Sequence, residues 1–102
     1  SHEIEYNLKT NGYNPIESLV GHGVGRELHE DPMVPCFVSG SHYEKVGLKE
    51  GMVLAIEIMY TQGKPGIKLD QDGWTLSTKD GKMSALFEET VAIGKNGPVI
   101  IT

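Results

Sequence analysis

The sequence predicts an α+β fold in which antiparallel strands dominate. Asp-Gly or Asn-Gly pairs at 72–73, 80–81 and 96–97 separate short stretches in the last third of the chain, a pattern typical of hairpins. Residues 52–60 form an apolar run of strand length, interrupted only by Glu57. Helical spacing is clearest close to the first residues.

The first element is a short helix over residues 3–11. Ile4 and Leu8 lie one helical turn apart, and Gly12 stands where helices commonly end. A helix of this length is marginal by itself in water, so it needs packing against other elements.

Loops and one short strand are predicted between this helix and the apolar run. Residues 15–20 predict a short strand, and residues 21–31 predict a mobile, glycine-rich loop whose backbone can approach a ligand closely. Pro32 and Pro35 break the chain that follows, and residues 38–48 predict a further loop.

The second half predicts a meander that follows a turn at 49–51. Its strands are expected at 52–60, 74–78, 84–94 and 99–102, and the three turn dipeptides separate the later strands because type I′ turns need φ > 0 at both central residues. Along 84–94 side chains alternate between the two faces. Glu88 and Glu89 must therefore point in opposite directions.

Composition and charge limit the classes of partner that the chain can have. The 102 residues are expected to form one domain, 1–102, with formal net charge −5 and pI near 5.2. The nine basic residues are scattered, which argues against nucleic acid as a partner. No apolar run approaches the ~20 residues that span a bilayer, so no membrane partner is expected. Cys36 is the single cysteine, which fits a reducing, cytoplasmic setting.

Glu57 is the strongest candidate for chemistry. A carboxylate inside an apolar strand loses hydration, and leaving it unpaired costs several kcal/mol, so it requires a partner. A metal ion is one such partner. A buried ion pair with Lys or Arg, or a strand end that reaches solvent, would also satisfy it.

Two histidines could join such a centre. His22 lies between glycines, which leave its imidazole accessible to a metal, although a turn with His22 facing water gives the same pattern. His29 suits acid–base or substrate-orienting work, because its pKa lies near neutrality, but it could instead pair with its acidic neighbours. His42 stands in a polar loop and receives no role.

Three further residues have two interpretations each. Glu88 is a metal ligand or an edge-strand carboxylate. Trp74 lines an apolar substrate pocket or packs in the core. Cys36 lacks a local nucleophile motif and is interpreted as structural.

Five segments in order resemble methionine aminopeptidase over nearly the whole chain. They are Gly-His-Gly-Val-Gly at 21–25, His-Glu-Asp-Pro at 29–32, Gly-Met-Val-Leu-Ala-Ile-Glu at 51–57, Asp-Gly-Trp-Thr at 72–75 and Ser-Ala-Leu-Phe-Glu-Glu-Thr at 84–90. The large helical insertion of the type II enzymes is absent, so type I is the closer match. The resemblance implies the C-terminal half of a pita-bread fold: mainly antiparallel sheet, one or two helices, and a pseudo-twofold relation to the other half.

The resemblance also implies roles for individual residues. His22, Glu57 and Glu88 match three of the family's five metal ligands, with Glu88 bridging two divalent ions (Mn, Fe, Co or Zn). Glu57 would also handle protons. His29 would contact the scissile peptide and its developing oxyanion, and Trp74 would wall the methionine pocket. The implied reaction is hydrolytic removal of N-terminal Met from nascent polypeptides.

The match has gaps. The family's two aspartate ligands belong to its N-terminal half, so we expect weak or partial metal occupancy and no appreciable peptidase activity from this chain alone. Leu28, Cys36, Ile58 and Glu89 stand where the family commonly has an aromatic residue, His or Asn, Pro and His respectively. None of these four differences removes a ligand.

Other readings stay open. The chain could be a non-catalytic pita-bread binding module, another pita-bread hydrolase such as a proline-specific aminopeptidase, or a short protein that completes its site with a partner subunit. Retention of three ligands argues against the first. A stand-alone half would expose the apolar face that normally packs on its twin, so either the missing half or self-association is expected to cover it.

Overall fold

The computed structural model describes residues 1–40 and 42–102. The elements in these residues are α1 (His2–Thr10), β1 (Asn14–Pro15), β2 (Gly21–Gly23), β3 (Glu30–Val34), the 3-10 helix η1 (His42–Lys45), β4 (Val53–Thr61), β5 (Ile67–Leu69), β6 (Leu76–Thr78), β7 (Ser84–Gly94) and β8 (Gly97–Ile100). The predicted α+β class, dominated by antiparallel strands, is confirmed. Neither helix has the length and hydropathy needed to cross a bilayer.

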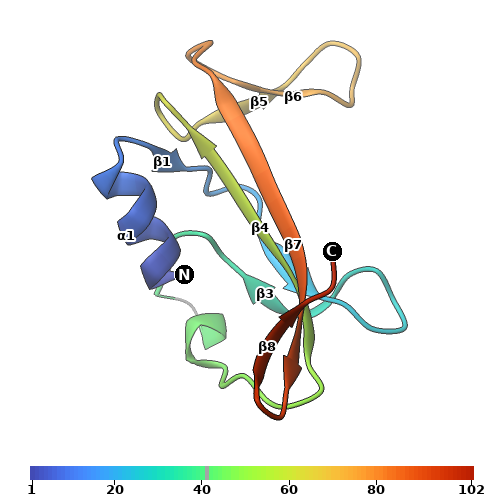
Figure 1. Ribbon diagram of the computed structural model, residues 1–102. Helices are drawn as coiled ribbons and strands as arrows, with labels where there is room; N and C mark the ends of the chain where they lie inside the picture. Colours follow the sequence, from blue (N-terminus) through green and yellow to red (C-terminus); the bar gives the residue numbers. More distant parts are fainter. Residues whose placement is uncertain (41) are drawn as a thin grey trace.

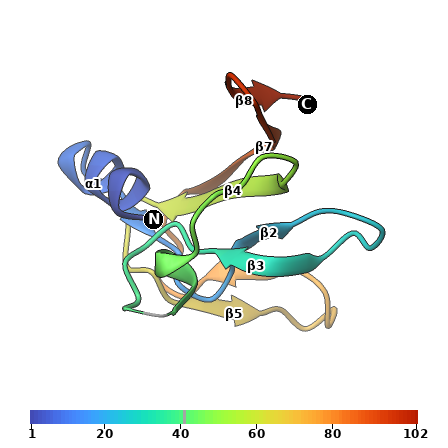
Figure 2. The ribbon, with the colours of Figure 1, turned by 90° about the horizontal axis from the view of Figure 1, so that it is seen from below.

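The main sheet has the order β3-β2-β4-β7-β8, and β1 also pairs with β4. β5 and β6 form a separate two-stranded sheet. The long strands β4 and β7 run side by side through the molecule, with α1 on one side of them (Figure 1). The tip of the β5–β6 hairpin and the segment between β2 and β3 extend on the other side (Figures 1 and 2).

The two faces of β4 have different surroundings. Leu54 and Ile56 line an apolar groove together with Ile4 of α1. Glu57 therefore belongs to the face opposite this groove, because side chains alternate along a strand. The buried apolar residues are few: Ile16, Cys36, Leu54, Ala55, Met59 and Val91.

The strand predicted at 15–20 is wrong beyond Pro15. From Pro15 to His22 the chain advances seven residues, whereas their partners Tyr60 and Ala55 on β4 are only five residues apart. The two additional residues cannot join the ladder, so the chain between β1 and β2 loops out from the sheet.

The mobile loop predicted at 21–31 is also wrong at both ends, which form β2 and the start of β3. The glycines allow this arrangement, because a Cβ atom on Gly21 would lie 2.3 Å from the backbone oxygen of Ala55. Pro32, predicted to break the chain, lies within β3. β3 pairs with β2 alone in the sheet, and a proline is tolerated on such an edge strand.

The remaining boundaries follow the sequence more closely. β4 and β7 lie where residues 52–60 and 84–94 predicted them, while β8 begins two residues before the predicted 99–102. The predicted strand at 74–78 keeps only its last three residues as β6. The predicted loop at 38–48 contains η1, and its residue 41 lies outside the described residues.

The turn type predicted for the glycine dipeptides is wrong. Gly73, Gly81 and Gly97 have positive φ, but within the described ranges no residue other than glycine does. A type I′ turn, with φ > 0 at both central residues, is therefore not formed. The 80–81 pair also joins β6 to β7, which lie in different sheets, so it does not close a hairpin.

We expect Gly21→Ala to lower the free energy of unfolding by about 2 kcal/mol, because overpacking against a fixed backbone carbonyl costs about 1–3 kcal/mol. Gly47→Ala is the matched control, since a Cβ atom there would meet nothing within 4 Å. Urea unfolding of both variants measures the difference. Equal stability of the two variants would contradict this account of β2.

Candidate metal centre

His22 is held in the middle of a sheet. It lies opposite Ala55 of β4 on one side and Met33 of β3 on the other. Its Nδ1 is 2.8 Å from the carbonyl oxygen of Gly23. A carbonyl can only accept a hydrogen bond, so Nδ1 is the donor in this contact, and Nε2 is the ring nitrogen left to face the site.

Glu57 is the direct partner of this imidazole. Its Oε1 lies 3.2 Å from Nε2 of His22, and the two side chains are 19% and 12% exposed. The alternative of a water-facing His22 in a turn is therefore wrong. The same contact answers the question of what pairs with Glu57: a histidine rather than Lys or Arg.

Glu88 lies directly opposite Glu57 in the β4–β7 ladder. Directly opposed residues of an antiparallel pair share a face, with Cβ atoms about 4.5–5.5 Å apart. His22 is opposite Ala55, two residues from Glu57, and so occupies a diagonal position on this face. The backbone thus brings all three predicted ligands to one face, and Glu89 points to the other.

Although the backbone brings the three residues to one face, their side chains do not meet at one point. In residues 1–40 and 42–102 no three His, Cys, Asp or Glu side chains are grouped closely enough to hold a metal ion. His22 and Glu57 are in contact, and Glu88 is exposed. Opposed like charges destabilise a sheet, and a divalent cation would remove that cost. The nitrogen and carboxylate donors fit such a cation.

His29 stacks close to the centre. Its ring centroid is 4.2 Å from that of His22, with the planes tilted by 53°. Both rings line an open pocket together with Met33, and His29 itself is exposed. Since Glu30 and Asp31 are both described and neither forms an ion pair with His29, the alternative of a salt-bridged surface histidine is not supported.

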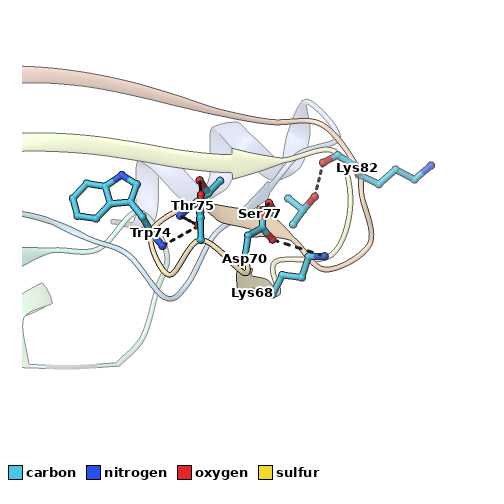
Figure 3. A network of polar contacts seen from close by, with 8 residues as sticks. Lys68, Asp70, Trp74, Thr75, Ser77 and Lys82 are labelled. Atoms are coloured by element: carbon cyan, nitrogen blue, oxygen red, sulfur yellow. Dashed lines mark hydrogen bonds and ion pairs between the residues drawn. The ribbon is translucent and has the colours of Figure 1, made fainter.

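Trp74 lies in the turn between β5 and β6. It is 87% exposed in this chain, so the alternative of a core aromatic is wrong. Its backbone N–H donates to Oδ1 of Asp72 over 3.0 Å. Figure 3 shows its side chain pointing away from the Asp70–Ser77 pair of the same hairpin.

Asp72 was predicted as part of a turn and of the resembling segment 72–75, without a role of its own. Its carboxylate accepts hydrogen bonds from the Thr75 hydroxyl and from the Thr75 and Trp74 N–H groups. These bonds, led by the hydroxyl, lower the pKa of Asp72 from its ordinary 3.8 to about 2. The spacing of Asp and Thr three residues apart around a glycine was the available signal.

Cys36 has the structural role expected of it. The side chain is fully buried, and its Sγ lies 3.8 Å and 3.7 Å from the carbonyl oxygens of Ile16 and Met59. Burial raises the pKa of the thiol, which disfavours the reactive thiolate.

Comparison with known families decides the assignment. Residues 1–95 match the family described as metallopeptidase family M24. The chain belongs to this family. Its members are metallopeptidases, so divalent metal cofactors are implied for the family.

Named relatives of the M24 chain are consistent with this. It is 49% identical over 102 residues to a methionine aminopeptidase of Clostridium perfringens and 43% identical over 102 residues to methionine aminopeptidase 1 of Bacillus subtilis. Each of the two alignments covers 100% of this chain and 40% of the relative. The chain therefore spans about two-fifths of the curated relatives it matches.

Solved structures identify the fold of the M24 chain. A methionine aminopeptidase from Thermotoga maritima superposes with a TM-score of 0.88 at 45% identity, over 97% of this chain and 39% of that one. The Rickettsia prowazekii enzyme gives 0.83 at 33% identity, over 94% and 38%. The prediction that the chain is part of a pita-bread fold is confirmed.

We expect the environment of Trp74 to respond to acid through Asp72. Because the folded pKa is lowered, this carboxylate stabilises the turn fully above its ordinary 3.8, and the contribution is lost as pH falls towards about 2. Near-UV circular dichroism of the single tryptophan should stay constant from neutrality to about pH 4 and change below it. Asp72→Asn should remove this local transition, with far-UV dichroism as the control for global unfolding. A wild-type midpoint at or above 3.8 would contradict the assignment.

Proposed function

We propose that residues 1–102 are the C-terminal half of the catalytic domain of a methionine aminopeptidase, a cytoplasmic enzyme that removes N-terminal Met from nascent polypeptides. The observation that carries the proposal is the placing of His22, Glu57 and Glu88 on one sheet face, with His22 and Glu57 in contact. The names of the relatives support the choice of substrate.

In this proposal His22, Glu57 and Glu88 would hold two divalent cations, with Glu88 as a ligand common to both. Mn, Fe, Co and Zn all suit a donor set of one imidazole and two carboxylates. When bound, such ions lower the pKa of a water molecule towards neutrality and polarise the scissile carbonyl. The Nδ1–H bond from His22 to the Gly23 carbonyl keeps Nε2 directed at the site.

The chain's own residues would then position the peptide and move protons. Glu57 would accept, on a carboxylate oxygen, the proton of the attacking water and later return it to the leaving amine. His29, stacked beside His22 and exposed to the pocket, would donate a hydrogen bond to the developing oxyanion. Trp74 would provide an apolar wall for the methionine side chain.

Two aspartate ligands of the family belong to its other half, so we propose weak or partial metal occupancy and no appreciable activity for this chain alone. The edge of β7 supports an incomplete assembly. β8 pairs only with residues 91–94 of β7, which leaves the described residues 84–89 with β4 as their sole partner strand. Leu86 and Phe87 on this stretch are 58% and 55% exposed.

We propose that the remaining half of the enzyme covers this edge, and that a second copy of the chain covers it in isolation. A non-catalytic binding module is the less favoured alternative, because the His22–Glu57 pair is retained. A proline-specific aminopeptidase is disfavoured by the names of the relatives.

We expect the isolated chain to bind Mn²⁺ weakly and the binding to depend on the shared face. Calorimetric titration should detect weak binding that is lost in His22→Ala and Glu88→Gln. Glu89→Gln is the matched control, because Glu89 lies opposite Ile56 on the other face, and it should bind as the wild type does. Equal loss in Glu89→Gln, or equal binding in His22→Ala, would exclude this site. Absence of binding in every variant would mean that these three residues bind metal only together with the other half.

We expect the intact enzyme that contains this chain to release Met from a Met-Ala-Ser peptide. Glu57→Gln should lower kcat/KM at least about 100-fold, because it removes both a ligand and a proton acceptor. Glu89→Gln should stay close to wild type. Release of Met is measured by chromatography. An inactive wild-type enzyme loaded with Mn²⁺, Co²⁺, Fe²⁺ or Zn²⁺ would overturn the proposed function.

A further inference from the structure

The turn between β5 and β6 is fixed by one carboxylate. Oδ1 of Asp72 accepts the N–H of Trp74 at 3.0 Å and that of Thr75 at 2.9 Å, and Oδ2 accepts the Thr75 hydroxyl. Both oxygens are therefore occupied by the two residues that follow Gly73. Asp72 forms no ion pair with any part of the chain that the structure describes.

The position of Trp74 depends on this turn more than on packing. Its side chain is 87% exposed, so little of the protein supports the ring. The hairpin beneath it is small, with three residue pairs between β5 and β6 in a sheet of their own. Gly73, at φ 72°, allows the sharp change of direction, but glycine alone makes a turn more flexible. The three bonds to Asp72 supply the order that glycine and packing do not.

The hairpin also lies on the side of the molecule that carries the predicted ligands. Its tip extends away from α1, on the same side of β4 and β7 as the segment between β2 and β3 that carries His29 (Figures 1 and 2). Glu57 points away from the groove next to α1, so the hairpin tip and the predicted ligands share one side. A large aromatic ring kept in water on that side is suited to contact an apolar group of a ligand.

We propose that Asp72 is a positioning residue for substrate: it holds the turn so that Trp74 is presented to the apolar side chain at the peptide's N-terminus. The inference rests on the proposed function, because it assigns Trp74 to the binding of that peptide. Asp72 itself touches no reacting group. Its effect is exerted through the main chain of Trp74 and Thr75.

This role predicts which kinetic constant changes. A disordered Trp74 must be ordered each time a peptide binds, and that entropy weakens the ground state and the transition state alike. The loss therefore appears in KM, while kcat is retained.

The test uses the intact enzyme that contains this chain, with a Met-Ala-Ser peptide as the probe. Asp72→Ala should raise KM about tenfold and leave kcat within about twofold. Asp72→Asn keeps an oxygen that can accept the two N–H groups, and Thr75→Val removes only the hydroxyl donor, so both should raise KM by less. Asp70→Asn is the matched control: Asp70 lies in the same hairpin, but its carboxylate contacts Ser77 and Lys68, and KM should stay at the wild-type value.

A second readout separates positioning from activity. In the 102-residue chain Trp74 is the only tryptophan, so its fluorescence anisotropy and acrylamide quenching report the turn directly. Asp72→Ala should lower the anisotropy and increase quenching, and Asp70→Asn should change neither.

The outcomes are distinct. Equal KM changes in Asp72→Ala and Asp70→Asn, or a fall in kcat at constant KM, would overturn the positioning role. If Asp72→Ala does not fold, Asp72→Asn and Thr75→Val decide the question by the same criteria. An inactive wild-type enzyme would refute the proposed function, and unchanged anisotropy in Asp72→Ala would separately refute the anchoring of Trp74.

Discussion

The register of β4 against β7 is the constraint on which the candidate site depends. It places Glu57 directly opposite Glu88, two carboxylates on one face of a sheet. Such a pair is unfavourable by itself, because the like charges are close and Glu57 is largely removed from water. A shift of one residue would send Glu88 to the other face and bring Glu89 in its place. Strand pairing therefore brings these two carboxylates to one face before any loop contributes.

The glycines of β2 are the second requirement. His22 can contact Glu57 only because β2 pairs closely with β4, and a Cβ atom on either neighbouring glycine would collide with backbone oxygen, of Ala55 at Gly21 and of Asp31 at Gly23. Glycine serves here to admit a neighbouring strand and does not make a flexible loop. The imidazole is thereby fixed from two directions, by the ladder and by its bond to the Gly23 carbonyl.

The sequence predicted what depends on local patterns and failed where long-range pairing decides. The apolar run around Glu57 and the alternation along 84–94 predicted β4, β7 and the opposite directions of Glu88 and Glu89. The prediction for residues 21–31 was wrong, because glycine and charge suggest a loop when the partner strand, with Ala55 33 residues after His22, is unknown. The three predicted ligands were identified from the family resemblance. The contact between His22 and Glu57 could be found only from the structure. The exposure of Trp74 was likewise beyond the sequence, since an aromatic residue after a turn is compatible with core and surface alike.

A site on one face of a sheet can surround a metal ion only in part. His22, Glu57 and Glu88 all project from the same side of three adjacent strands, so their donor atoms would approach a bound ion from one hemisphere. Tetrahedral or higher coordination needs donors from the other hemisphere as well. Those donors must come from water, from a substrate or from protein outside this chain. Residues 84–89 of β7, which have β4 as their sole partner strand among the described residues, contain Glu88 itself and expose Leu86 and Phe87. Protein that covered this edge would lie next to Glu88, so one docking event could both bury the apolar strand and add donors to the proposed site.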